Sequence, residues 1–102
     1  MQGVRLTDLA RQDLNDIWDY VSQRSQASAD NLIIEITKKF ATLRNFPNIG
    51  KEQSHLLINL RSFPYKDYQI FNQQFDEGIE ILCVLHRSRD IESLFENFFD
   101  AL

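Results

Sequence analysis

The sequence predicts an α+β fold: an N-terminal strand, an antiparallel two-helix hairpin packed on a mainly antiparallel four-stranded sheet, and a short C-terminal helix. Three observations lead to this prediction. Two successive segments carry the apolar periodicity of amphipathic helices, a proline and a glycine end the second segment, and residues 60–90 alternate short β-prone runs with turn signals. A length of 102 residues predicts a single domain over residues 1–102.

The composition is that of a folded globular protein, with 43% hydrophobic and 25% charged residues. The net charge of -4 arises from 15 acidic and 11 basic residues. A general nucleic-acid binder carries a basic field, so we expect no direct nucleic-acid binding outside a local patch.

The single cysteine, Cys83, has no partner for an internal disulfide and lies in an apolar run, which predicts a buried, reduced thiol. The N-terminus lacks the pattern of a signal peptide, and no apolar run approaches the roughly 18 residues that span a membrane. We therefore expect a cytoplasmic protein without membrane contact.

A short strand is expected at residues 2–6, followed by a helix that Thr7 or Asp8 caps and that runs to about Arg24. The inward stripe of this helix is Ala10, Leu14, Ile17, Trp18 and Val21. The opposite face is Asp8, Arg11, Gln12, Asn15, Asp16 and Asp19. Carboxylates three apart share a helical surface, but no histidine or cysteine joins them, so a solvated face is favoured over a metal site. No metal or cofactor is expected.

A polar break at residues 25–28 offers a serine cap for the second helix. Its stripe is Ala29, Leu32, Ile33, Ile36, Phe40 and Leu43. Pro47 and Gly50 end it, and residues 51–59 are expected to form a loop. Trp18 and Phe40 are predicted to be core residues, and the change Trp18→Ala is expected to cost about 3 to 5 kcal/mol.

Three strands are predicted within residues 60–65, 68–71 and 79–85. The turn Asp76-Glu77-Gly78 joins the last two, with the glycine at a position of positive φ. Simple alternation predicts that one face of the last strand carries Ile79, Ile81, Cys83 and Leu85, and the other carries Glu80, Leu82, Val84 and His86. Both faces are apolar at the centre, which indicates a central strand covered on both sides.

Residues 91–102 have apolar side chains at 91, 94, 95, 98, 99 and 102, the pattern of another amphipathic helix. This helix either folds back over the second face of the sheet or docks on a partner. Folding back is favoured, because an exposed patch with three phenylalanines promotes aggregation.

The order of these elements and four motifs resemble the ParE-like toxins of bacterial toxin-antitoxin modules, within the RelE/ParE superfamily. The resemblance covers about residues 4–90. The motifs are Leu14-x-x-Ile17-x-x-Tyr20-Val21, Pro47-Asn48-Ile49-Gly50-Lys51, Arg61-x-Phe63 with Tyr68-x-Ile70-Phe71, and Val84-Leu85-His86-x-x-Arg89-Asp90. Two positions depart from the family pattern: Cys83 stands where a basic residue is common, and Arg87-Ser88 where a small residue is usual.

The resemblance implies a compact toxin that binds and inhibits DNA gyrase and is neutralised by a cognate ParD-like antitoxin. It leaves open a homodimer or a toxin-antitoxin hetero-oligomer. The predicted contact residues for target or antitoxin are Lys51, Arg61, His86, Arg87 and Arg89, and the three arginines are expected near one edge of the sheet, where they repel each other unless an anionic group meets them. We expect no catalytic residues. Affinity for the antitoxin would come from buried apolar anchors, and acidic antitoxin side chains would meet the three arginines.

Two other functions stay open. The first is RelE-like cleavage of messenger RNA on the ribosome, with His86 for proton transfer and cationic groups on the phosphate. The segment after Asp90 contains no tyrosine, lysine or arginine, although RelE-like ribonucleases commonly place a functional side chain there. The second is an inactive family member that only binds antitoxin. His86 and Asp90 have structural alternatives as a strand-ending hydrogen bond and an ion pair with Arg89, and His55 is interpreted as incidental.

Overall fold

The computed structural model describes residues 3–98 and places three helices around one sheet. The elements are β1 (Val4–Leu6), α1 (Asp8–Ser22), α2 (Gln26–Asn45), β2 (Lys51–Glu52), β3 (Arg61–Tyr65), β4 (Tyr68–Phe75), β5 (Gly78–His86) and α3 (Ile91–Phe98). The strand order is β1-β5-β4-β3-β2, with β1 parallel to β5 and the other pairs antiparallel. The predicted fold class is confirmed, with five strands instead of four because β2 forms within the expected loop.

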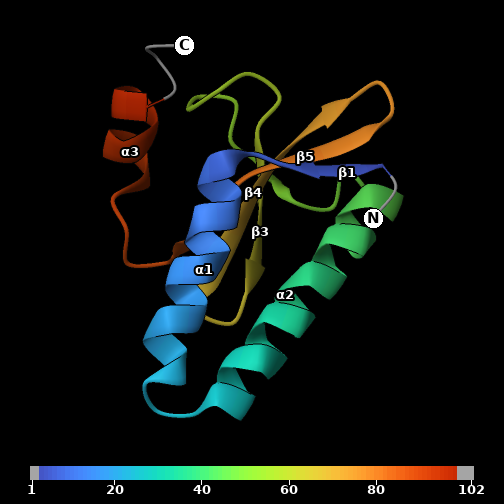
Figure 1. The fold of residues 1–102 in the computed structure, drawn as a ribbon. Coiled ribbons are helices and arrows are strands. Elements are labelled where there is room, and N and C mark those ends of the chain that lie inside the picture. Colours follow the sequence, from blue (N-terminus) through green and yellow to red (C-terminus); the bar gives the residue numbers. More distant parts are fainter. Residues whose placement is uncertain (1–2, 99–102) are drawn as a thin grey trace.

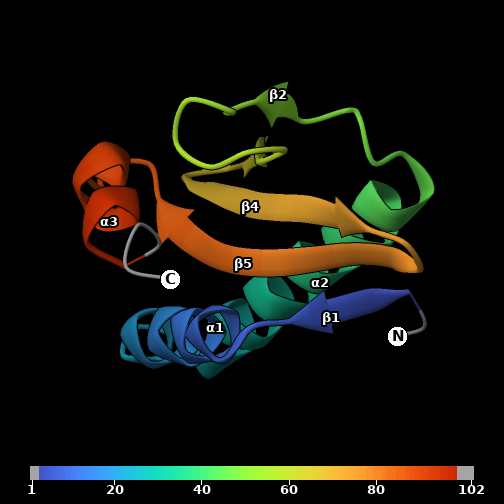
Figure 2. The same cartoon turned by 90° about the horizontal axis from the view of Figure 1, so that it is seen from above.

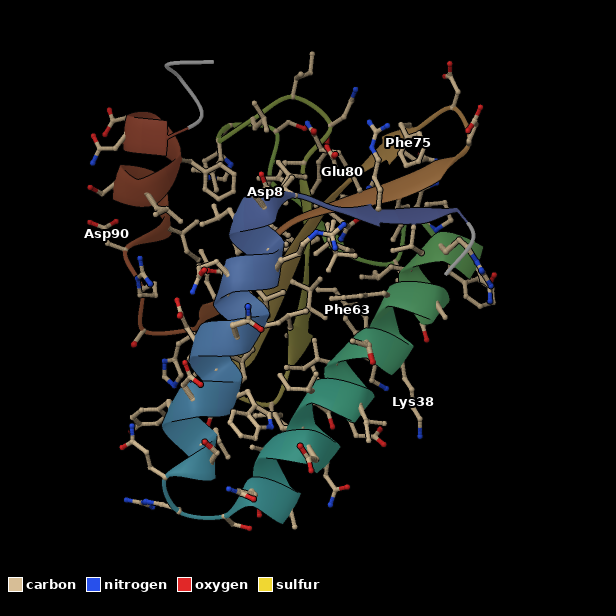
Figure 3. The ribbon with its side chains drawn as sticks, in the orientation of Figure 1. Asp8, Lys38, Phe63, Phe75, Glu80 and Asp90 are labelled. Carbon is tan, nitrogen blue, oxygen red and sulfur yellow. The ribbon has the colours of Figure 1, made fainter. Side chains whose placement is uncertain are left out.

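The helical hairpin begins and ends where its capping residues predict. The Thr7 hydroxyl accepts a hydrogen bond from the Ala10 N–H, and the Ser25 hydroxyl accepts one from the Ser28 N–H. Helix α1 ends two residues before the predicted Arg24. Both helices lie on one side of the sheet (Figure 1), and Phe63 of β3, labelled in Figure 3, packs against the core on that side. The core on this side is Ala10, Ile17, Ile36, Phe40, Leu43, Ile70, Ile79, Ile81 and Val84.

A β-bulge in β5 makes the predicted alternation wrong beyond Leu82. Phe71 pairs with Cys83, but the next residue of β4, Asn72, pairs with Ile81, so Leu82 is an extra residue. One extra residue moves all later side chains to the opposite face. As a result, Val84 joins Ile79 and Ile81 on the helix side, while Leu82, Cys83 and Leu85 lie on the second face.

The second face of the sheet is covered by α3 and by residues of the 53–60 loop, as the sequence favours. Phe95 is buried against Phe71, with ring centroids 5.2 Å apart, and Leu56, Leu57, Ile91 and Leu94 pack around them. Figure 2 shows α3 at the end of β5 that leads into it. Cys83 is a free, buried thiol in this layer, as predicted, and burial raises its pKa. The expected contribution of Phe99 lies outside the described residues.

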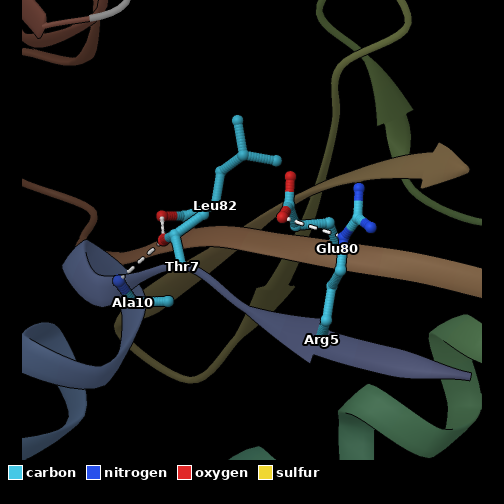
Figure 4. Close-up of polar contacts among 5 residues, drawn as sticks. All are labelled: Arg5, Thr7, Ala10, Glu80 and Leu82. Carbon is cyan, nitrogen blue, oxygen red and sulfur yellow. Dashed lines mark hydrogen bonds and ion pairs between the residues drawn. The ribbon is translucent and has the colours of Figure 1, made fainter.

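Beyond the end of β1, residues at the start of α1 form hydrogen bonds with the free edge of β5. The Thr7 N–H donates to the Ile81 carbonyl (3.1 Å), and the Thr7 hydroxyl donates to the Leu82 carbonyl (2.6 Å), as Figure 4 shows for the second bond. Asp13 Oδ2 then accepts from the Val84 N–H (2.9 Å). Backbone groups of β5 that lack a neighbouring strand are thus paired by the cap and first turns of α1.

Gly78 is required for a close approach between β5 and the N-terminal segment. A Cβ at this position would collide with the carbonyl oxygen of Gly3, and Ile79 N–H donates to that oxygen (2.9 Å). The turn predicted at residues 76–78 is confirmed. The glycine serves the contact with the start of β1.

Two surfaces of α1 show how far helical periodicity predicts burial. All six residues of the predicted polar face are exposed, and no cluster of metal-ligating side chains occurs among residues 3–98. Trp18, in contrast, is only half-buried, and its Nε1 donates to Asp30 Oδ1 of α2 (2.8 Å) at the rim of the hairpin. The prediction that Trp18 is a core residue is wrong. Trp18 directly follows Ile17, so its side chain lies at the edge of the inward stripe of the helix.

No helix in the described part of the chain is long and apolar enough to cross a membrane.

We predict that Phe40→Ala lowers the free energy of unfolding by about 3 to 5 kcal/mol, because Phe40 is fully enclosed between helix and sheet. Trp18→Ala is expected to cost only about 1 to 2 kcal/mol, since it removes partial burial and one exposed hydrogen bond. Urea denaturation of both variants measures the two losses in free energy of unfolding and shows which is larger. An equal or larger loss in Trp18→Ala would show that Trp18 anchors the core.

Candidate functional site

The five predicted contact residues lie in two separate regions. Arg61 pairs with Asn72 of β4, and His86 pairs with Tyr68, which lies four residues before Asn72 on the same strand. At about 3.3 Å per residue, this separates Arg61 from His86 by roughly 13 Å along the strands. Arg61 therefore does not lie beside Arg87 and Arg89. This differs from the expectation that the three arginines gather at one edge of the sheet.

Arg61 is held by the segment that follows α2. Its Nη1 donates to the carbonyl oxygens of Gly50 (2.8 Å) and Asn48 (3.3 Å). Lys51 is exposed on β2 and pairs with Ser62, next to the Glu52–Arg61 pair. Because neighbouring strand residues point to opposite faces, Lys51 and Arg61 face different sides of the sheet.

His86 ends β5 in a hydrogen-bonded turn. The Ser88 N–H donates to His86 Nδ1 (3.1 Å), and Ser88 Oγ lies 2.8 Å from the same nitrogen. A ring nitrogen that accepts an N–H carries no proton, so the neutral imidazole carries its proton on Nε2. The ring meets Tyr68 edge to face, with centroids 5.5 Å apart.

Arg87 and Asp90 have local structural contacts. Arg87 Nη2 lies 3.4 Å from Asp67 Oδ1, and the Arg87 N–H donates to the Asp67 carbonyl (2.8 Å), which joins the two turns at this end of the sheet. Asp90 Oδ1 accepts from the Ser93 N–H (3.2 Å) at the start of α3 (Figure 3). Asp90 is thus a helix cap, in place of the ion pair with Arg89 that the sequence left open.

His86 and Arg89 share a hollow of about 380 Å³ with residues of α1, which we call the α1–β5 hollow. Its polar and aromatic lining is Asp13, Asp16, Tyr20, Tyr68, His86, Ser88 and Arg89. Ile17 and Val84 form its apolar floor on the helix side, and Leu85 also lines it. Tyr20 is 73% exposed at its mouth, which leaves a large aromatic ring free for contact.

Two groups in the hollow have raised pKa values. Burial raises the pKa of Asp13, and the Val84 N–H and the Arg89 charge oppose this shift in part. Burial also raises the pKa of Tyr68, with smaller contributions from Asp67 and Tyr20. The hollow therefore contains a carboxylate fixed to the backbone, a phenol that keeps its proton, an imidazole and a guanidinium.

This arrangement is better suited to contact than to phosphoryl chemistry. Asp13 and His86 Nδ1 already accept backbone hydrogen bonds, and Lys51 and Arg61 are too distant to share a phosphate with Arg89. Tyrosine and arginine around an apolar floor are the side chains that dominate protein interfaces.

Sequence reasoning missed Asp13, Tyr20 and Tyr68 as site residues. Asp13 had a signal, because it is a charged residue within the inward stripe between Ala10 and Ile17. Tyr68 could be placed opposite His86 by counting back from the turn at residues 76–78, with one residue of error from the bulge. Nothing in the sequence marked Tyr20 as a site residue, except that it belongs to the family motif in the first helix.

Comparison with known proteins identifies the family. The chain matches the family described as ParE toxin of type II toxin-antitoxin system, parDE, over residues 4–91. A solved chain entitled "Chromosomal ParDE TA system from P. aeruginosa" superposes with a TM-score of 0.70 at 20% sequence identity, covering 84% of this chain and 96% of that one. No curated protein matches. The family match spans most of the sequence and contains the strands and helices that build the α1–β5 hollow, so the chain belongs to the ParE toxin family of type II parDE toxin-antitoxin systems.

Proposed function

We propose that the chain is a toxin that inhibits DNA gyrase by protein-protein binding, without chemistry of its own, and that a ParD-like antitoxin neutralises it. The observation that carries this proposal is the division of the basic residues between two separate regions of the sheet. A nuclease must bring its cationic groups to one phosphate, whereas a binding surface can use them at separate points.

The α1–β5 hollow is the proposed contact surface for the target. Tyr20 is exposed at its mouth, Arg89 is exposed on its rim, and Ile17 and Val84 supply an apolar floor. A partner side chain that enters the hollow would bury apolar area and meet the guanidinium. Such a cluster fits the few tyrosine and arginine anchors that carry most of the affinity in an interface.

One observation favours the alternative of RNA cleavage: the hollow brings His86, Tyr68 and Arg89 together. His86 Nε2–H and the Tyr68 hydroxyl are possible proton donors for a leaving group. A general base would still be needed, and the nearby carboxylate of Asp13 is bonded to the Val84 N–H. Protein binding is therefore the favoured function.

The antitoxin is proposed to add a strand at β1 and to place acidic side chains near Arg61, Arg87 and Arg89. Strand β1 stands at one end of the sheet order, so in the described structure one edge of its backbone has no neighbouring strand. An apolar groove of about 360 Å³ lies beside it, with Val4, Leu6 and Phe40 as apolar lining and Arg5 and Arg11 as charged lining. We call it the β1 groove.

The charges at the β1 groove suit an acidic amphipathic partner. Arg5 is held by Glu80 (3.0 Å) and lies 3.9 Å from the centre of the Phe75 ring, whereas Arg11 is exposed on α1. An acidic side chain from the antitoxin would meet Arg11 first. This contact would guide association more than it would hold the complex.

Expression of the chain alone in a bacterium tests the proposed activity. We expect growth arrest, loss of DNA supercoiling and intact messenger RNA. With purified proteins, Tyr20→Ala should weaken gyrase inhibition by about 30-fold, the equivalent of about 2 kcal/mol for an aromatic anchor. Arg89→Ala should weaken it by about 10-fold.

The matched control is Ile34→Ala, which removes an exposed apolar side chain of α2 outside the hollow and should leave inhibition unchanged. Site-specific cleavage of messages with normal supercoiling would contradict gyrase inhibition and support the nuclease. Unimpaired growth would point to an inactive, antitoxin-binding member of the family.

We also predict that Arg11→Glu weakens binding of the antitoxin encoded beside this gene by about 10-fold at low salt, mainly through slower association. The difference should shrink in high salt, because exposed charges are screened. Arg24→Glu makes the same charge change in the turn between α1 and α2 and should alter affinity less than 2-fold. If both variants weakened binding equally, the effect of Arg11→Glu would come only from the change in net charge, and a specific contact at Arg11 would be contradicted.

A further inference from the structure

A second, polar pocket lies on the helix side of the sheet beyond the end of α2. It has a volume of about 230 Å³, and we call it the Asn72 pocket. Its lining includes Pro47, Asn48, Glu52, Arg61, Asn72 and Gln74. Asn72 and Arg61 are cross-strand partners, two pairs along from Ile70 and Phe63 of the helix-side core, so the pocket continues that face where the helix stops.

Asn72 lines this pocket and carries an unpaired hydrogen-bond donor. The residue is 1% exposed, and its Nδ2 is buried with no hydrogen-bond partner in the described structure. Buried amide groups are nearly always paired, because a lost hydrogen bond to water is otherwise not replaced. The described fold thus contains a donor that a ligand can satisfy.

Three further polar residues of the lining indicate what that ligand must offer. Arg61 is fixed in place by the Asn48 and Gly50 carbonyls, and Gln74 follows Asn72 on the same face. Glu52, opposite Arg61, is exposed, and its carboxylate accepts a hydrogen bond from Ser54 Oγ (2.8 Å). The buried end of the pocket therefore donates, and the exposed end accepts.

The charges and the volume select a small neutral group. One guanidinium and one carboxylate in the lining balance each other, so a second carboxylate would be repelled by Glu52. The pocket is smaller than the roughly 300 to 1,000 Å³ of sites for drug-sized ligands. A carboxamide matches both ends, because its oxygen accepts from Asn72 and its NH2 group donates to Glu52.

We propose that the Asn72 pocket binds the carboxamide side chain of an asparagine or glutamine from a protein partner. The exposed side chains of Phe46 and Ile49 flank Pro47 and Asn48 in sequence and supply apolar contact for the segment that carries this amide. The assignment to a partner rests on the proposed function as a protein-binding toxin. The carboxamide chemistry of the pocket follows from its lining alone.

Titration of the 15N-labelled full chain with propionamide, propionate and uridine tests the chemistry. Propionamide should shift the side-chain NH2 signals of Asn72 and Gln74 in a saturable manner, and propionate should bind at least about 5-fold more weakly. The proposal is overturned by the absence of saturable shifts with propionamide. It is also overturned by tighter binding of propionate, which indicates a carboxylate site, or of uridine, which indicates a nucleobase site.

Asn72→Leu separates binding from folding. This variant replaces the unpaired donor by an apolar side chain of similar size, so its melting temperature should equal or exceed that of the wild type. The Gln74 shifts with propionamide should disappear. Gln69→Leu, on the same strand outside the pocket, should keep them. Propionamide shifts that persist in Asn72→Leu would overturn the proposal, and the wild-type titration stands if this variant does not fold.

Neither target nor antitoxin takes part in the titration. A negative titration leaves the growth and supercoiling experiment valid, and a chain without toxicity leaves the titration valid.

Discussion

The pairing of α1 with the open edge of β5 is the constraint on which the rest of the structure depends. Strand β1 covers β5 only as far as Ile81, and beyond that point the backbone would face α1 with unpaired groups. Thr7 and Asp13 supply the missing partners at the Leu82 carbonyl and the Val84 N–H. A helix fixed in this way must run beside the last residues of β5, which sets the position of the whole hairpin on the sheet.

The same pairing produces the surface to which we assign target binding. Because Asp13 holds α1 at Val84, Tyr20 two turns later comes to lie near His86 and Arg89 at the end of β5. The bulge at Leu82 contributes as well, since it turns Val84 toward the helices and Cys83 and Leu85 toward α3. A partly buried carboxylate costs free energy, and the raised pKa of Asp13 reflects that cost, yet this carboxylate orders the site.

The sequence predicted the elements well because each has a local cause: a serine or threonine cap, a proline after the second helix, and a turn at residues 76–78. It could not predict the bulge at Leu82, which depends on pairing with Phe71 and Asn72 of another strand. The sequence pattern also predicted that Arg61 and Arg89 lie at one edge of the sheet. In the structure they are farther apart, since distance in a sheet depends on register. The unpaired amide of Asn72 had no signal, because its missing partner is a property of the packed structure.

Amide hydrogen exchange at Val84 tests the pairing of α1 with β5 most directly. In the wild type and in Asp13→Asn, whose side-chain oxygen can still accept, the Val84 N–H should be protected. In Asp13→Ala it should exchange at least about 10-fold faster, the equivalent of about 1.4 kcal/mol for the lost hydrogen bond. The Cys83 N–H, which alternation directs toward β4, should be unchanged in all three proteins and serves as the internal control. Equal protection of Val84 in Asp13→Ala and the wild type would contradict the account.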